Sequence, residues 1–116
     1  MTYNIASGRC YDDLSQISAH GGAPENLSKC AEVIKCISPD ICGLNEINHY
    51  FSEEKKIKNQ AKFLAEYTGL ENWFFGKAIH IESSGGRDYG NAVISKHPIL
   101  SSEVIPIPDP VIRDEV

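Results

Sequence analysis

The chain has 116 residues, of which 41% are hydrophobic and 23% are charged, and its formal net charge is −5. This length predicts a single domain with a modest core, and this composition excludes a disordered chain. The acidic balance excludes a broad cationic surface for nucleic acid or anionic membranes, and no apolar run reaches the roughly 18 residues that span a bilayer. We therefore expect a globular protein of the cytoplasm.

The cysteines support this location. They stand at Cys10, Cys30, Cys36 and Cys42, without a C-x-x-C pair and without a histidine nearby at zinc-finger spacing. Cys30 and Cys36 fall in an expected helix at a spacing that points them to different faces, so a disulfide between them is not expected. The first residues lead into a strand-like segment rather than a signal peptide. We predict reduced, buried thiols.

The first expected strand spans residues 2–7 and contains Asn4, an unusual residue there because asparagine is a poor strand former and its amide needs partners when buried. Asn4 either ties down a neighbouring loop or has a functional role. Residues 9–24 carry polar side chains and paired glycines without periodicity, which predicts a loop that can carry specificity or simply be exposed. The candidates for substrate contacts in this loop are Arg9, Tyr11 and His20.

A helix is expected at residues 24–37, where apolar residues recur at helical spacing, a proline stands in the first turn and Ser-Pro follows the end. The apolar run Ile41–Leu44 then predicts a strand that is buried on both faces and ends at Glu46. Strand, helix and strand in this order form a crossover unit. This unit brings Asn4 and Glu46 to the same end of neighbouring strands.

The remainder of the chain predicts a helix followed by a hairpin and a further strand. In order, the segments are a connection at 48–52, a helix at 53–70, a strand at 73–81, a tight turn at 82–88, a strand at 89–96 and a strand at 99–107. Gly69 offers a helix stop, and aromatic and β-branched residues mark the strands. The turn glycines do not form a phosphate loop, because no helix follows them. We expect His80 to be hydrogen-bonded or exposed rather than catalytic.

Glu46 has two interpretations when the strand is considered by itself. A carboxylate at the end of a buried strand can be held rigidly with its oxygens toward a cleft, which suits a ligand for a hard cation. Strand ends also carry charges simply because they meet water. The residue alone leaves both interpretations open.

Three segments together narrow the choice. They read T-Y-N-I-A-S-G-R at residues 2–9, S-P-D-I-C-G-L-N-E-I-N at residues 38–48 and Y-G-N-A-V-I-S-K-H-P-I at residues 89–99. In this order and at these separations they resemble the endonuclease/exonuclease/phosphatase superfamily of metal-dependent phosphoesterases. The resemblance implies an α/β (α+β) fold that is half of a four-layer α/β/β/α sandwich, with one mixed sheet and two helices on one face.

The same resemblance implies a site. Glu46 would ligate Mg²⁺ or Mn²⁺, and Asn4 would contact the water shell of the metal or the scissile phosphate. The hairpin would border the substrate cleft, where Arg87 would hold a substrate phosphate and Asn91 would hydrogen-bond near the site. The implied substrate is a phosphorylated small molecule or a phosphodiester, and the acidic net charge of −5 argues against long nucleic acids.

Other parts of the family pattern are missing or altered. Family members carry a general-base aspartate, an aspartate-asparagine pair and a histidine in segments that would follow this sequence. Residues 1–116 are therefore expected to be the N-terminal part of such a domain and inactive alone. An open sheet face must be covered, so we expect the chain either to be a fragment of a longer protein or to self-associate through this face. Asn45 replaces a frequent glutamine, and Ala6 replaces an acidic residue of the DNA-repair branch. The alternative function is a non-catalytic binding or structural module that keeps the fold.

Overall fold

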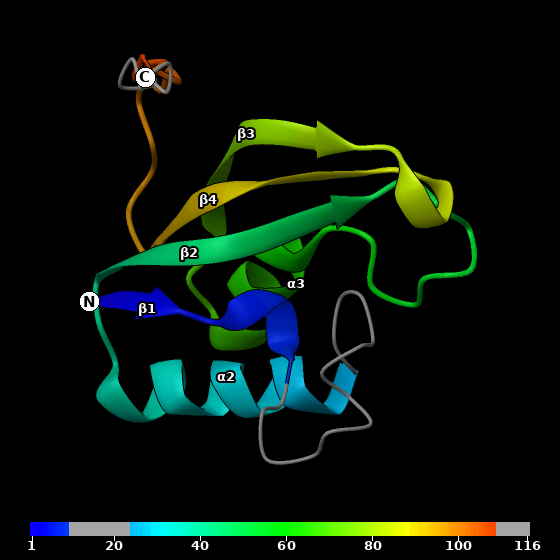
Figure 1. Ribbon diagram of the computed structural model, residues 1–116. Helices are drawn as coiled ribbons and strands as arrows, with labels where there is room; N and C mark the ends of the chain where they lie inside the picture. The colour runs from blue at the N-terminus through cyan, green and yellow to red at the C-terminus, as the bar shows by residue number, and fades with distance from the viewer. Residues whose placement is uncertain (10–23, 109–116) are drawn as a thin grey trace, which may run out of the picture.

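Residues 1–9 and 24–108 form a four-stranded sheet with two α-helices packed against it (Figure 1). The computed structural model describes residues 1–9 and 24–108. The strands are β1 (Thr2–Asn4), β2 (Ile41–Tyr50), β3 (Asn72–Ile81) and β4 (Arg87–Ser95); the α-helices are α2 (Pro24–Ile37) and α3 (Gln60–Thr68); and the 3-10 helices are η1 (Ala6–Gly8) and η2 (Ser83–Gly85). No helix among the described residues is long and apolar enough to cross a membrane.

The sheet is mixed, with the strand order β1-β2-β4-β3. β1 runs parallel to β2, in a register that places Asn4 beside Asn45, whereas β4 pairs antiparallel with both β2 and β3. The crossover from β1 to β2 passes through α2, as predicted for a strand-helix-strand unit. The predicted class, a mixed sheet with two helices on one face, is confirmed.

The core lies between the helices and one face of the sheet. Its buried residues come from both helices and from β2 and β4, and include Leu27, Ala31, Ile34, Cys42, Leu44, Ala61, Leu64, Ala65, Ala92 and Ile94. Each fully buried leucine or isoleucine contributes about 1.5–3 kcal/mol to stability. Because α2 and α3 cover the same face, residues of the opposite face such as Val93 and Ile41 stay exposed by 39% and 53%.

The bounds of α2 match the predicted helix at residues 24–37, because local signals fix both ends. The helix begins at Pro24 and ends at Ile37, before Ser38 turns into the left-handed region at φ 55°.

Three cysteines in the described part of the chain carry free thiols: Cys42 is buried, Cys30 is half-buried and Cys36 is exposed. The predicted burial is therefore wrong for Cys36, which lies off the apolar stripe of α2.

Two predicted boundaries in the first half of the sheet are wrong. The first strand was expected over residues 2–7, but β1 ends at Asn4 because the backbone turns left-handed at Ala6 and Ser7, with φ 50° and 56°. β2 was expected to end at Glu46, but it continues through a bulge between Leu44 and Ile47 and ends at Tyr50. The residues predicted as a connection at 48–52 are therefore mostly strand.

The second helix is shorter than predicted. It begins at Gln60 rather than at residue 53, because the Asn59 side chain caps it by accepting a 3.0 Å hydrogen bond from Lys62 N. The preceding segment lies against the sheet instead, where Tyr50 N donates to Lys58 O at 2.7 Å. Gly69, with φ 81°, ends the helix as predicted.

The hairpin of β3 and β4 agrees with the predicted segments to within two residues at each end.

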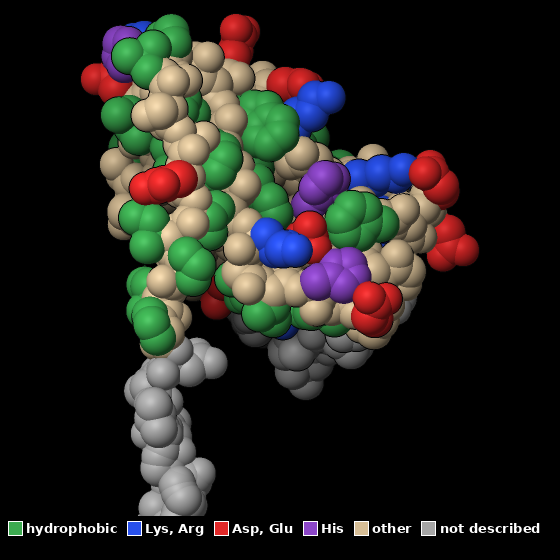
Figure 2. Space-filling model, turned by 90° about the horizontal axis from the view of Figure 1, so that it is seen from above, with side chains coloured by type: hydrophobic (Ala, Val, Ile, Leu, Met, Phe, Trp, Pro, Cys, Tyr) green, Lys and Arg blue, Asp and Glu red, His purple; other side chains and the backbone are tan. Residues whose placement is uncertain are grey.

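By contrast, the strand predicted at 99–107 is wrong, since residues 99–108 are extended without sheet pairing. Pro106 and Pro108 cannot donate to a ladder, and Leu100 and Ile107 are 96% and 87% exposed. Figure 2 shows hydrophobic side chains gathered along this segment. The self-association predicted for the open sheet face stays a prediction.

Candidate active site

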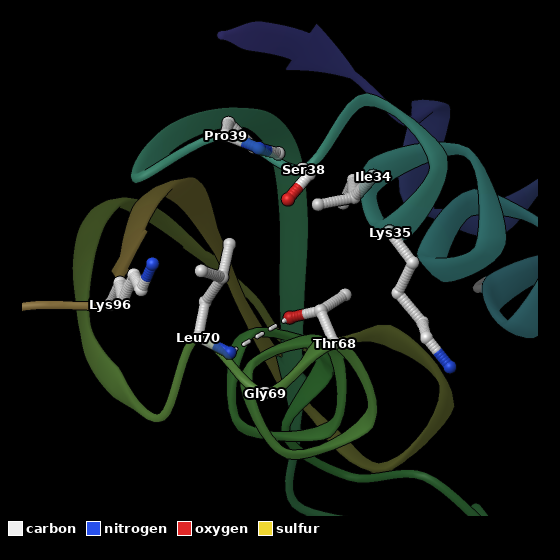
Figure 3. Close-up of a pocket in the computed structure, with 8 residues that line it drawn as sticks. All are labelled: Ile34, Lys35, Ser38, Pro39, Thr68, Gly69, Leu70 and Lys96. Carbon is white, nitrogen blue, oxygen red and sulfur yellow. Dashed lines mark hydrogen bonds between the residues drawn. The ribbon is translucent and has the colours of Figure 1, made fainter.

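One cavity of the molecule contains none of the predicted site residues. It has a volume of about 240 Å³ and lies where α2, α3 and β4 end, with Ile34, Ser38, Leu70 and Lys96 among its lining residues (Figure 3). Its hydrogen bond, from Leu70 N to Thr68 Oγ1 at 3.3 Å, belongs to the end of α3. This cavity shows no arrangement for chemistry, so the candidate site is built around Glu46 instead.

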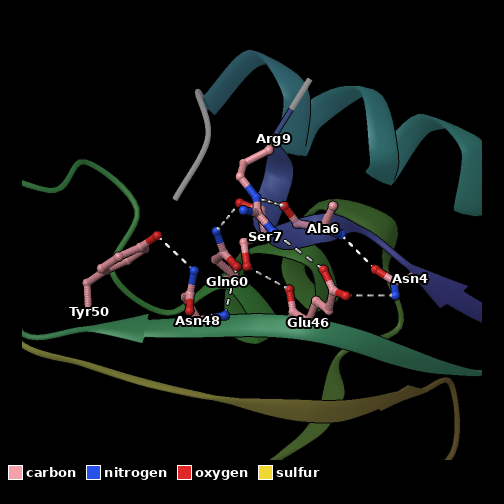
Figure 4. Close-up of polar contacts among 8 residues, drawn as sticks. All are labelled: Asn4, Ala6, Ser7, Arg9, Glu46, Asn48, Tyr50 and Gln60. Atoms are coloured by element: carbon pink, nitrogen blue, oxygen red, sulfur yellow. Dashed lines mark hydrogen bonds and ion pairs between the residues drawn. The ribbon is translucent and has the colours of Figure 1, made fainter. Parts of the chain in front are cut away.

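Asn4 and Glu46 meet where β1 ends. The parallel register brings Asn4 next to Asn45, and Asn4 Nδ2 donates a 3.2 Å hydrogen bond to Glu46 Oε1 (Figure 4). Asn4 Oδ1 accepts from Ala6 N at 2.9 Å, which fixes the amide orientation. Asn4 therefore holds the carboxylate through its NH₂ group, and its oxygen is engaged with η1.

The backbone around this pair is strained. Four described non-glycine residues have positive φ, and three of them, Ala6, Ser7 and Glu46, belong to η1 and the β2 bulge. Ser7 Oγ donates to Glu46 O at 3.0 Å, so the two strained segments hold each other. Strain of this kind gathers at functional sites when the surrounding structure fixes it. No residue pattern in the sequence reveals a left-handed glutamate, and the sequence analysis missed it.

Arg9 faces the other oxygen of the carboxylate. Its Nη2 lies 3.7 Å from Glu46 Oε2, and both side chains are 33% exposed. Arg9 Nε donates to Ala6 O at 3.1 Å, which orients the guanidinium. Arg9 was predicted from the sequence as a candidate for substrate contacts, without a link to Glu46. The other two candidates, Tyr11 and His20, lie outside the described residues.

Gln60 ties the site to α3, and the sequence analysis missed it as well. The side chain is buried; its Nε2 donates to Ser7 O at 3.0 Å and its Oε1 accepts from Asn48 N at 2.8 Å. A single amide thereby joins η1, β2 and the first turn of α3. A glutamine at a helix start gives no sequence signal of burial, because this residue type is mostly exposed.

A second polar group lies farther along β2. Asn48 Nδ2 donates to the Tyr50 hydroxyl at 2.9 Å, while the buried Asn48 Oδ1 has no hydrogen-bond partner in the described part of the chain. Burial raises the pKa of Tyr50, and a hydrogen bond from Arg87 together with the charges of Arg87 and Arg9 opposes that rise. Arg87 pairs with Tyr50 across the β2–β4 ladder, which places the two side chains on the same face of the sheet.

Asn91 is connected to the candidate site through a hydrogen bond with Asn45. Asn45 Nδ2 donates to Asn91 Oδ1 at 3.3 Å, so amides from β1, β2 and β4 follow one another across the sheet beside Glu46. His80 is hydrogen-bonded, as expected: its Nδ1 lies 2.7 Å from Asp88 Oδ1, and its Nε2 lies 3.1 Å from Glu82 Oε1.

The donor set fits a hydrated divalent cation. Mg²⁺ is usually held by one or two carboxylates together with waters and substrate phosphates, and Glu46 offers one carboxylate that is 33% exposed. Within residues 1–9 and 24–108 there is no group of three or more histidine, cysteine, aspartate or glutamate side chains that could hold a metal. Binding by these residues alone is therefore expected to be weak.

Glu46 therefore lies in a strained bulge of β2, held by Asn4, on a mixed sheet that helices cover on one face. The profile of the Endonuclease/Exonuclease/phosphatase family matches residues 1–115 of the chain, so the chain belongs to this family. Members of this family generally use divalent metals, and the fold is that of nuclease- and phosphatase-type hydrolases. A search of curated proteins found no match.

A solved structure agrees with this assignment. The chain is similar to an endonuclease/exonuclease/phosphatase from Beutenbergia cavernae, with 25% identity and a TM-score of 0.66 over 87% of this chain and 26% of that one. A second similar structure is a family protein from Leptotrichia buccalis, with 19% identity and a TM-score of 0.49 over 86% of this chain and 37% of that one. The chain thus spans about a quarter to a third of the length of these proteins.

Proposed function

We propose that the chain supplies the Glu46-centred part of a Mg²⁺- or Mn²⁺-dependent phosphoesterase. The observation that supports this function best is the 3.2 Å hydrogen bond between Asn4 and Glu46 at the meeting point of two parallel strands, in a member of this family. A carboxylate fixed in this way keeps one oxygen directed away from the asparagine. This second oxygen is the proposed ligand.

The residues of the chain have separate roles in this proposal. Glu46 holds the cation, and Asn4 orients the carboxylate and borders the scissile phosphate. Arg87 and Asn91, on β4, bind the substrate, and the guanidinium of Arg87 suits a phosphate oxygen pair. When bound, the metal supplies positive charge that neutralises phosphate oxygens.

The proposed substrate is a phosphorylated small molecule or a phosphodiester. The net charge of −5 disfavours a long polyanion, whereas one phosphate can be met by a cation and one or two arginines. We propose a cytoplasmic location, in agreement with the free thiols of Cys30, Cys36 and Cys42.

The rest of the catalytic groups are proposed to lie in a longer protein. A general base, an aspartate-asparagine pair and a histidine, implied by the family resemblance, would come from that remainder, so we expect residues 1–116 alone to be inactive. The remainder would cover the open face of the sheet, where Val93 and Ile41 are exposed, and without it this face would self-associate.

The test compares Glu46→Gln with the parent in the full-length protein, on a panel of phosphodiesters and phosphomonoesters. Losing the ligand should reduce hydrolysis by about 100-fold or more, because the cation contributes several kcal/mol of charge stabilisation. Glu71→Gln, an exposed carboxylate at the start of β3, is the charge-matched control. Parental rates in Glu46→Gln would show that Glu46 is not the ligand.

A second candidate function is a non-catalytic binding module. It is favoured by Ala6, which stands where the DNA-repair branch has an acidic residue, and by the lack of a three-residue ligand group in the described part of the chain. Magnesium titration with thermal denaturation separates the two functions, because a cation that binds the native state raises its stability. An unchanged melting temperature at millimolar Mg²⁺ would favour the module.

A further inference from the structure

Arg9 occupies the side of Glu46 that a cation would need. Asn4 holds Oε1 at 3.2 Å, so Oε2 is the oxygen left for a ligand, and Arg9 Nη2 lies 3.7 Å from this oxygen. A divalent cation at Oε2 would face the positive guanidinium at short range. Like charges repel strongly at such distances, so Arg9 and the cation compete for one carboxylate oxygen.

The ion pair between Arg9 and Glu46 is weak enough to open. The separation of 3.7 Å exceeds that of a good hydrogen bond, and both side chains are one third exposed, at 33%. An ion pair of this kind contributes little, because water and salt screen it. The bond from Arg9 Nε to Ala6 O, at 3.1 Å, keeps the side chain close to the site if the ion pair opens.

A phosphate of the substrate would offer Arg9 a second acceptor. Arg9 lies beside Glu46 of β2, and Arg87 of β4 pairs with Tyr50, which lies farther along the same strand. The charges of both guanidinium groups oppose the rise of the Tyr50 pKa. Two guanidinium groups on this part of β2 are suited to a phosphate, which accepts hydrogen bonds from several donors.

We propose that Arg9 exchanges partners, pairing with Glu46 in the metal-free protein and with the phosphate of the substrate once a divalent cation holds Glu46. This proposal rests on the proposed function and adds Arg9 to it as a substrate-positioning residue. It also makes metal and phosphate binding depend on each other. Phosphate draws Arg9 away from Glu46 and strengthens metal binding, and by linkage the metal strengthens phosphate binding equally.

The test measures Mn²⁺ binding to the chain by electron paramagnetic resonance, with and without inorganic phosphate. Without phosphate, Arg9→Gln should bind Mn²⁺ about two- to fivefold more tightly than the parent, as expected for the loss of one competing surface ion pair. Adding phosphate should tighten Mn²⁺ binding in the parent and have a smaller effect in Arg9→Gln. Arg9→Lys keeps the charge and should restore much of the parental response.

Two further variants separate the possible failures. Lys29→Gln removes one exposed positive charge from α2 and should leave both measurements unchanged, which controls for net charge. If Glu46→Gln loses Mn²⁺ binding while Arg9→Gln matches the parent, the partner exchange is wrong and the proposed function stands. If Mn²⁺ binds the parent and Glu46→Gln equally, or binds neither, both the exchange and the metal site are wrong.

Discussion

Replacing Gln60 by leucine would test how the polar network holds η1 against β2. The buried Gln60 side chain accepts from Asn48 N at 2.8 Å and donates to Ser7 O at 3.0 Å. Leucine is similar in size and favours helix, so the substitution removes both hydrogen bonds with little other change. The amide of Asn48 and the carbonyl of Ser7 then lose these partners.

The expected effect follows from the cost of unpaired buried groups. Each such group costs about 1–3 kcal/mol, and two of them give about 2–6 kcal/mol, partly offset by the apolar burial of leucine. A net fall of about 2–4 kcal/mol would be a large part of a typical domain stability of about 5–15 kcal/mol. The polar bonds of one side chain thus decide whether the domain is robust or marginal.

Urea denaturation provides the measurement. Unfolding would be followed by far-UV circular dichroism and by the fluorescence of Trp73, the single tryptophan of the chain. Lys62→Leu, on an exposed position of the same helix, is the matched control and should change the unfolding free energy by no more than about 0.5 kcal/mol. A fall of less than about 1 kcal/mol in Gln60→Leu would refute the reasoning.

In Gln60→Glu, the stability of the protein should depend on pH. A carboxylate can accept from Asn48 N but cannot donate to Ser7 O, whereas a protonated carboxyl can do both. Burial raises the pKa of the introduced carboxyl in the folded state above its unfolded value of about 4.3, so the folded protein holds more protons. Stability relative to the parent should therefore fall as the pH rises from about 4.3 through the raised pKa.

The two ends of α3 give further tests with the same urea assay. Asn59→Ala removes the cap on Lys62 N and should cost about 1 kcal/mol, while Asn59→Asp keeps an acceptor and should stay close to the parent. Gly69→Ala should cost about 1–2 kcal/mol through backbone strain alone, since Gly69 has φ 81° and a Cβ there meets nothing within 4 Å. Parental stability in Asn59→Ala would mean that the cap contributes nothing, and parental stability in Gly69→Ala would mean that the helix end does not need a left-handed residue.

Local signals explain why part of the fold could be predicted. The proline at the start of α2 and the Ser38-Pro39 pair after it gave both bounds, and the aromatic and β-branched residues of β3 and β4 gave the hairpin. The second helix was overextended, because the charged residues before Asn59 have good helix propensity but no apolar face to bury. Propensity alone does not show where packing ends.

The meeting of Asn4 and Glu46 was predicted from the sequence, whereas the residues that hold them were missed. The crossover topology brought Asn4 and Glu46 together, as expected from strand order. The positive φ of Glu46 and the bonds of Gln60 depend on contacts between segments far apart in the sequence. The sequence alone gives no signal for such contacts, so the supporting network was not foreseen.

Stability and the proposed metal binding depend on the same strained backbone. Left-handed non-glycine residues cost about 1–2 kcal/mol each, and η1 and Glu46 are held in this conformation by the bonds from Ala6 N to Asn4, from Ser7 Oγ to Glu46 O, and from Gln60 to Ser7 O. These bonds also fix the carboxylate. Gln60→Leu should therefore weaken Mn²⁺ binding although its lost bonds go to backbone atoms, whereas Asn59→Ala, one residue away, should reduce stability and leave Mn²⁺ affinity unchanged.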